Sequence, residues 1–267
     1  KPTFWRALTD NDRGSRFHIK SGSWLASDMF IDCKKTEVIM DGERQKQYAP
    51  DNNSYGGDVA AGEIIVKYTY ETVSNPVTTV IVSYTIDAIG NIKVDVDYTG
   101  VKGLPELPVF GMRFLMPTVA EGYTYEGLSG ETYPDRMAGG IPGVYEVQGL
   151  PVTPYMVPQD CGMHMQTKWL EIVRKTSLDN TDRGERSSRL KITAEEGKYF
   201  AFSCLPYTAQ ELENAMHHEE LPPARRTVVS ILGAVRGVGG INSWGADVED
   251  AYHISGEQDI TYGFWIE

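Results

Sequence analysis

The sequence predicts an all-β protein whose antiparallel strands form a sandwich or a barrel. Apolar and polar residues alternate with a period of two over long stretches, which is typical of strands with one buried face. The 27 glycines and 14 prolines interrupt these stretches at regular intervals. With 267 residues, 41% of them hydrophobic, the chain is long enough to bury a large core. No linker is evident, so we expect one domain over residues 1–267.

The clearest strands lie at residues 64–70, 80–86 and 92–98. Each places β-branched or aromatic side chains at every second position, the pattern of a half-buried strand. Residues 87–91 (DAIGN) form a short turn between the second and the third, so the three make a meander. Further strands are expected at 109–116, 168–175, 188–194, 198–204, 226–232 and 260–267, and an exposed polar loop at about 43–58.

One segment carries clear helix signals. Thr208 and Glu211 have the spacing of a capping box, in which each side chain satisfies a backbone N–H of the first turn. Pro222-Pro223 prevents the helix from continuing. We expect His217 and His218 to end this helix, where a positive charge suits the negative end of the helix dipole.

The composition excludes several classes of partner. A net charge of −12 and an isoelectric point near 4.9 argue against binding nucleic acid or anionic membranes. No apolar run is long enough to span a bilayer, and we identify no signal peptide. Cys33, Cys161 and Cys204 lack metal-site spacing and predict neither a disulfide framework nor a zinc site. Reduced thiols favour a cytoplasmic location; a periplasmic one stays open, because the first residues read as mid-protein sequence.

The first polar cluster follows an aromatic residue near the start of the chain. Trp5 and Arg6 precede Asp10, Asn11 and Asp12. The three side chains suggest a metal loop, but the further oxygen ligands and the late glutamate of a calcium loop are missing. We therefore expect a structural role, in which these side chains accept backbone hydrogen bonds in a tight turn and Arg6 offsets their charge.

The second cluster contains Glu131, Tyr133, Asp135 and Arg136. Two interpretations stay open. Glu131 and Asp135 have the residue types of the acid/base pair that glycoside hydrolysis uses. Against this, the adjacent Arg136 favours an ionised Asp135, and the run Tyr-Pro-Asp-Arg is typical of a turn that anchors other segments. We favour a structural or interface role.

The third feature is the segment 239–245 (GGINSWG), which presents Trp244 among glycines and small polar residues. An indole on such a loop offers a flat face that can stack on a sugar and an N–H that can donate. The alternative is that Trp244 closes one end of the sandwich. Elsewhere the sequence has no GxSxG, P-loop, GxGxxG or HExxH motif, and we identify no complete catalytic constellation or metal site.

Taken in order, these motifs resemble one family. Trp5-Arg6 with residues 9–14, Glu131 with residues 133–136, and the glycine-rich segment ending at Trp244 are accompanied by further matches at Tyr155, Pro158, 202–208 and 221–223. The set is similar to the C-terminal domain of bacterial β-galactosidases of glycoside hydrolase family 2, which in some members is a separate small chain. The resemblance covers essentially all 267 residues. It implies a large antiparallel β-supersandwich of the galactose mutarotase-like kind, with one or two short helices.

The resemblance also implies a function. The catalytic glutamates and the magnesium and sodium sites belong to a TIM-barrel domain or large chain, so we expect no cofactor here and no activity of this chain alone. Trp244 is expected to stack on a galactoside such as lactose at the mouth of the active site, with Asn242 and Ser243 setting its loop. Ile241 and Asn242 replace the family's usual aspartate pair. The complete retaining enzyme is expected to be an oligomer.

Two alternatives remain at this stage. The first is an aldose 1-epimerase on the same kind of sandwich, for which His164 and Glu131 are the candidate acid and base. The second is a carbohydrate-binding module without catalytic activity, which would use Trp244 to bind sugar by itself.

Overall fold

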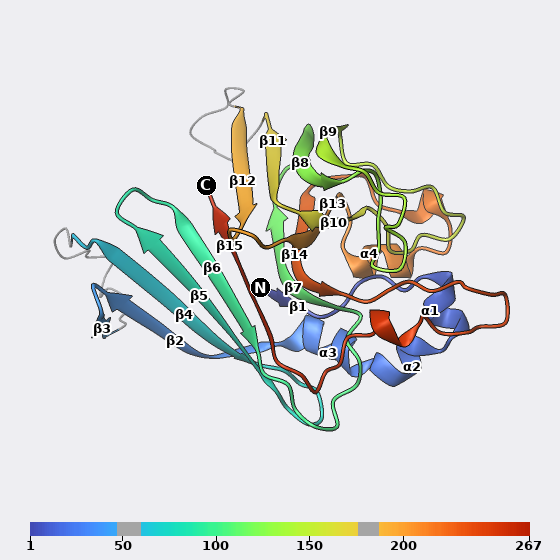
Figure 1. Cartoon of the computed structure of the whole chain (residues 1–267), viewed down its shortest axis with the longest axis horizontal. Coiled ribbons are helices and arrows are strands. Elements are labelled where there is room, and N and C mark those ends of the chain that lie inside the picture. Colours follow the sequence, from blue (N-terminus) through green and yellow to red (C-terminus); the bar gives the residue numbers. More distant parts are fainter. Residues whose placement is uncertain (47–59, 176–186) are drawn as a thin grey trace.

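The computed structural model describes residues 1–46, 60–175 and 187–267. Its strands form a five-stranded and a ten-stranded sheet (Figure 1). The smaller sheet has the order β1 (Pro2–Thr3), β7 (Val109–Met116), β14 (Thr227–Val235), β13 (Phe200–Leu205), β10 (Met163–Thr167). The larger sheet has the order β3 (Glu43–Gln45), β2 (Asp32–Met40), β4 (Glu63–Glu71), β5 (Thr79–Asp87), β6 (Ile92–Tyr98), β15 (Ile260–Ile266), β12 (Ser188–Ala194), β11 (Trp169–Arg174), β8 (Gly122–Leu128), β9 (Pro142–Gln148).

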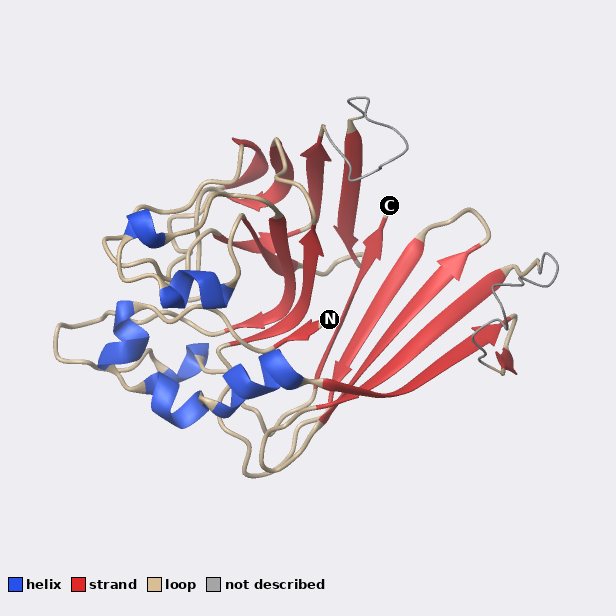
Figure 2. Ribbon diagram, turned by 180° about the vertical axis from the view of Figure 1, so that it is seen from behind, coloured by secondary structure: helices blue, strands red, loops and turns tan. Residues whose placement is uncertain are grey.

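The main core lies between the two sheets. Phe110 of β7 contacts two rings of the larger sheet, with centroid distances of 5.2 Å to Tyr98 and 6.3 Å to Tyr262. The Tyr262 hydroxyl donates a hydrogen bond of 2.8 Å to the Ile231 carbonyl of β14. Strands β5 and β6 contribute to this core, and strands β2 to β6 fan out from it beyond the smaller sheet (Figure 2).

The smaller sheet is also covered on its other face. Val109, Ala201 and Leu232 belong to a second apolar cluster on that side, together with Tyr133 from a connecting loop. Because both faces are covered, β7 and β13 consist mostly of buried residues. The covering layer contains the short helices and long loops, which gather at one side of the molecule (Figure 2).

The predicted all-β, antiparallel fold is confirmed. Every strand pairing in the described residues is antiparallel. β4, β5 and β6 form the predicted meander, and β7, β11, β12, β13, β14 and β15 match the other predicted strands within a few residues. In the turn between β5 and β6, Asp87 Oδ1 accepts the N–H groups of Ile89 (3.0 Å) and Asn91 (2.9 Å).

The sequence did not predict β1, β2, β8, β9 and β10. These strands lie at or next to the edges of the sheets. In β8, Tyr123 and Tyr125 are buried, but Gly122 and Gly127 interrupt the run of strand-forming residues. β9 is at least partly exposed along its whole length, and the ladder of β10 shifts register between His164 and Thr167. The expected loop at 43–58 begins instead with the short strand β3, and residues 47–59 lie outside the described part.

The described residues contain more helix than expected. Three short helices, α1 (Asp10–Gly14), α2 (Phe17–Ser21) and α3 (Ser23–Phe30), occupy a region for which we expected one tight turn. The turn prediction at Asp10–Asp12 is corrected: Thr9 and Asp12 form a capping box that begins α1.

The helix predicted after Thr208 is confirmed as α4 (Ala209–Asn214), with the expected capping box. The prediction that His217 and His218 end this helix is wrong. Ala215 is already extended, and a separate 3-10 turn follows at His218–Glu220.

No helix in the described part of the chain is long and apolar enough to cross a membrane. Cys33 is exposed, Cys161 and Cys204 are buried, and all three are unpaired.

Asp28 provides a test of how the helices are attached to the smaller sheet. Its buried carboxylate accepts hydrogen bonds from Thr3 Oγ1 (2.6 Å), the Phe4 N–H (3.0 Å) and the Arg113 guanidinium (2.6 Å). Asp28→Ala leaves Arg113 buried without its partner, so we expect the free energy of unfolding to fall by about 3–5 kcal/mol in urea titrations. Asp32→Ala, which removes an exposed pair with Lys34, should cost about 0–1 kcal/mol. Similar losses for both variants would contradict this role of Asp28.

Candidate functional site

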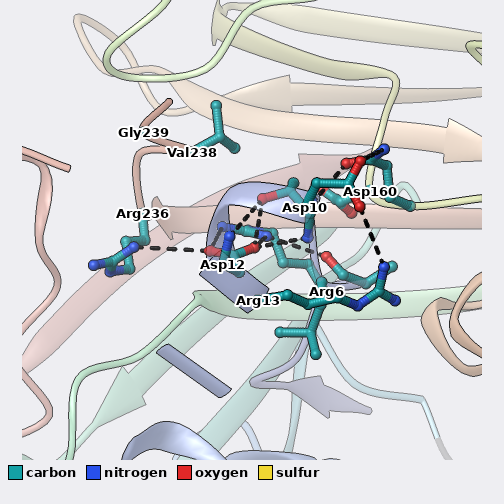
Figure 3. Close-up of polar contacts among 12 residues, drawn as sticks. Arg6, Asp10, Asp12, Arg13, Asp160, Arg236, Val238 and Gly239 are labelled. Atoms are coloured by element: carbon teal, nitrogen blue, oxygen red, sulfur yellow. Dashed lines mark hydrogen bonds and ion pairs between the residues drawn. The ribbon is translucent and has the colours of Figure 1, made fainter. Parts of the chain in front are cut away.

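The polar residues near the start of the chain meet at a buried ion pair. Arg6 Nη1 lies 2.6 Å and Nη2 3.2 Å from the two carboxylate oxygens of Asp12 (Figure 3). Asp12 also accepts the Thr9 N–H at 2.8 Å. Burial by itself would raise the pKa of Asp12, but Arg6 and the Thr9 hydrogen bonds outweigh it and lower the pKa below its usual value. Asp12 is therefore a structural anchor.

Arg236 lies on the other side of Asp12, directly after β14 (Figure 3). Its fully buried guanidinium is 3.9 Å from Asp12, 2.5 Å from Asp247 and 3.5 Å from Glu106. It also stacks over the Phe17 ring, 4.1 Å from the centroid. This arginine joins α1 and α2 to the segment that contains Trp244.

Trp5 is part of the interior. Its indole N–H donates to both carboxylate oxygens of Glu213 in α4 (3.1 and 3.2 Å), and Glu213 also accepts the Leu8 N–H at 2.9 Å. Asp10, by contrast, is exposed and pairs with Gln159: the Asp10 N–H donates to the Gln159 amide oxygen at 2.9 Å. Trp5 thus binds the start of the chain to α4, and Asp10 binds α1 to the loop that contains Gln159.

The second cluster has a similar role. The buried Tyr133 hydroxyl donates to Asp160 at 2.8 Å. Asp135 Oδ1 accepts the Val238 N–H (2.9 Å) and Oδ2 accepts the Gly239 N–H (2.8 Å). Both oxygens of Asp135 therefore bind the backbone about 100 residues downstream, which favours the anchoring interpretation over an acid/base role.

Glu131 is exposed, and in the described structure its recorded partners do not include Asp135, the other member of the acid/base pair considered from the sequence. Its Oε2 accepts the Thr153 hydroxyl (2.6 Å) and the Gly162 N–H (2.9 Å). These contacts stabilise the loop that follows β9.

His164 is unsuited to epimerase chemistry. Its ring stacks on Phe202 at 4.7 Å, and its Nε2 lies 3.0 Å from the Tyr123 hydroxyl in the interior. Burial lowers the pKa of His164 to about 4. A histidine in this position cannot reach the anomeric oxygen of a sugar in solution.

A polar cleft lies where these segments meet. Its volume is about 330 Å³, and its walls include Asp10, Asn11, Glu131, Arg136, Tyr155 and Asp160. Four of these six belong to the two polar clusters predicted from the sequence: Asp10, Asn11, Glu131 and Arg136. Tyr155 is one of the further positions that resemble the family. Gln159 and Asp160 also line the cleft and were not selected. No local signal distinguishes Asp160 from other aspartates, because its burial and its contact with Tyr133 depend on the fold.

Trp244 is 91% exposed, so it does not close the end of the sandwich. It belongs to the segment 237–248, here called the Trp244 loop. Asn242 Oδ1 accepts the N–H groups of Trp244 (2.8 Å) and Ala246 (3.3 Å), so Asn242 shapes this loop from within. Ser243 is exposed beside it. Val238, at the start of the loop, lines the polar cleft.

The loop also lies directly against α1. Gly245 has a φ of +79°, and a Cβ atom at this position would lie 2.8 Å from the Gly14 carbonyl oxygen. Only glycine permits both this conformation and this approach.

Asp160 should give the protein a characteristic pH dependence. Burial raises its pKa to about 7, whereas an unfolded aspartate titrates near about 3.9. Between about pH 4 and 7 the folded state therefore holds the additional proton, and stability falls as the pH rises through this window. Asp160→Asn removes this titrating carboxyl group. The free energy of unfolding of the variant, relative to that of the native protein, should therefore increase from pH 5 to pH 8 in urea titrations.

Asp32→Asn, at an exposed aspartate, is the control and should show a smaller change between the two pH values. A stability difference for Asp160→Asn that is the same at pH 5 and pH 8 would show that Asp160 does not titrate in this range.

The sequence matches the family described as "Beta galactosidase small chain" over residues 1–266. It is 60% identical over 267 residues to a β-galactosidase small subunit of Latilactobacillus sakei, covering all of this chain and 84% of that protein. It is 31% identical to the β-galactosidase BgaC of Bifidobacterium adolescentis, covering 97% of this chain and 22% of that one. With a β-galactosidase of Streptococcus thermophilus the identity is 30%, covering 100% of this chain and 23% of that one.

Among solved structures, a galactose mutarotase-like protein from Lactobacillus casei aligns with 79% of this chain and 71% of its own, at a TM-score of 0.35 and 11% identity. The family match includes every motif described above. The chain belongs to the β-galactosidase small chain family.

Proposed function

We propose that this chain is the small-chain component of a β-galactosidase of glycoside hydrolase family 2 and that it completes the mouth of an active site located on another domain. The observation that carries the proposal is the exposed indole of Trp244, presented by a loop whose two ends are bound to buried side chains. The similarity to a β-galactosidase small subunit supports the assignment. In the longer relatives, this chain corresponds to less than a quarter of the polypeptide.

In this proposal the catalytic glutamates, with any magnesium and sodium ions, belong to a TIM-barrel domain or large chain. A retaining hydrolysis requires two carboxyl groups about 5–5.5 Å apart on either side of the glycosidic bond. In the described residues, Asp12, Asp135 and Glu131 instead bind arginine, backbone or hydroxyl groups. The substrate proposed is a terminal β-D-galactoside such as lactose.

Trp244 would act as a platform for one face of the sugar. Covering that face with an indole contributes about 1–2 kcal/mol by the area removed from water. Asn242 and Ser243 set the loop, and Asn242 supplies no carboxylate where the family usually has one. We further propose that residues 1–267 form one domain and that the complete enzyme is an oligomer.

The platform is tested in the enzyme assembled from this chain and its catalytic partner. Trp244→Ala should raise KM for lactose by about 5- to 30-fold, the equivalent of 1–2 kcal/mol. Trp244→Tyr, which keeps an aromatic face, should restore part of the affinity. Ile89→Ala is the matched control, because Ile89 is 85% exposed but lies in the β5–β6 turn. An unchanged KM for Trp244→Ala would reject the platform role.

A non-catalytic carbohydrate-binding module is the second candidate, because it too would expose Trp244 in the isolated chain. The isolated chain is expected neither to hydrolyse a chromogenic galactoside nor to bind galactose or lactose measurably in calorimetry. Hydrolysis would show that the catalytic groups lie on this chain. Clear sugar binding without hydrolysis would favour the binding module.

A further inference from the structure

We propose that Asp135 is a positioning residue for Trp244: its carboxylate fixes the start of the Trp244 loop and thereby the place of the indole. This inference rests on the proposed function of Trp244 and deepens it, because it names the side chain that holds the platform in position.

The first argument is the geometry of the two hydrogen bonds. Asp135 accepts the N–H groups of two consecutive residues, Val238 and Gly239, with one oxygen each (2.9 and 2.8 Å). Gly239 and Gly240 have φ values of +68° and +80°, so the chain turns sharply at this point. A carboxylate that accepts two adjacent backbone N–H groups stabilises such a turn with charge-assisted hydrogen bonds.

The second argument is that the next side chain, Arg136, binds a backbone carbonyl of the same segment. The Arg136 guanidinium donates to the Gly239 carbonyl and lies 3.8 Å from Asp135. The Asp135 side chain is 5% exposed, whereas that of Arg136 is 51% exposed. Asp135 is therefore the desolvated partner, whose hydrogen bonds are the more costly to lose.

The third argument is the close fit of the loop backbone. A Cβ atom at Gly237 would lie 2.9 Å from Asp135 Oδ1 and 2.7 Å from Val248 Cγ2. A Cβ atom at Gly240 would lie 2.6 Å from Asn11 Nδ2. The loop backbone thus lies directly against these side chains and leaves little room for another path.

The far end of the loop is held independently of Asp135. Arg236 binds Asp247 at 2.5 Å, and His253 Nε2 lies 2.8 Å from the Val248 carbonyl oxygen. Because Arg236 also contacts Asp12 and Glu106, its replacement would disturb the interior. Asp135 is the better residue to vary, since its two hydrogen bonds to Val238 and Gly239 lie at the start of the loop.

The first measurement is amide hydrogen exchange of the folded chain. Asp135→Asn keeps the side-chain volume but replaces one of the two acceptor oxygens with an NH₂ group. Exchange at one of the two N–H groups, that of Val238 or that of Gly239, should therefore accelerate by about tenfold, the effect of losing one such hydrogen bond. Asp87→Asn is the matched control: Asp87 also accepts two backbone N–H groups, in the β5–β6 turn. Both N–H groups bind Asp87 Oδ1, which an asparagine can keep, so this variant should leave exchange at Val238 and Gly239 unchanged and change exchange at Ile89 and Asn91 only slightly.

The second measurement is steady-state kinetics of the assembled enzyme. Asp135→Asn should raise KM for lactose in the direction of Trp244→Ala, with a smaller effect on kcat, and Asp87→Asn should change neither. The double variant Asp135→Asn/Trp244→Ala should have the same KM for lactose as Trp244→Ala alone, because a positioning residue has no effect once the positioned group is gone. A purely structural loss would add to the effect of Trp244→Ala.

These results separate the two proposals. If Trp244→Ala leaves KM unchanged, the platform fails, while exchange at Val238 and Gly239 still decides whether Asp135 holds the loop. If Trp244→Ala raises KM but Asp135→Asn alters neither exchange nor KM, the positioning proposal is overturned and the platform stands. Additive effects in the double variant would also overturn the positioning role.

Discussion

The layer that covers the smaller sheet depends on one buried carboxylate. Asp12 lies between Arg6, which precedes α1, and Arg236, which follows β14. All three side chains are almost fully buried, so each charge has lost its water and relies on the others for compensation. This interaction joins the start of the chain to the base of the Trp244 loop, and the arrangement of the cleft depends on it.

A sheet covered on both faces explains why the polar motifs are structural. The inner face of the smaller sheet packs on the larger sheet, and its outer face packs under loops with little regular structure. Such loops satisfy only part of their backbone groups by pairing with one another, so side chains satisfy others. Asp135, Glu131 and Glu213 all accept backbone N–H groups from segments distant in the sequence.

The exposed indole and the buried side chains that bind its loop have complementary roles in the function that we propose. A large aromatic side chain that is 91% exposed gains almost nothing from burial in this chain, so the platform role that we propose for it requires a surface supplied from outside. In that proposal, a loop with fixed ends would lose little conformational freedom when the partner surface binds. This division of roles is consistent with a chain that corresponds to only part of its longer relatives.

The sequence by itself determined the features that depend on neighbours along the chain. Alternation marked the meander of β4 to β6, and the spacing of Thr208 and Glu211 marked α4, because the contacts involved are local. The tertiary structure alone decided the meeting of Asp135 with Val238 and the burial of Asp160. It also decided that Trp244 faces outward, since burial and contacts across 100 residues follow from how the sheets and loops pack and leave no trace in the local pattern.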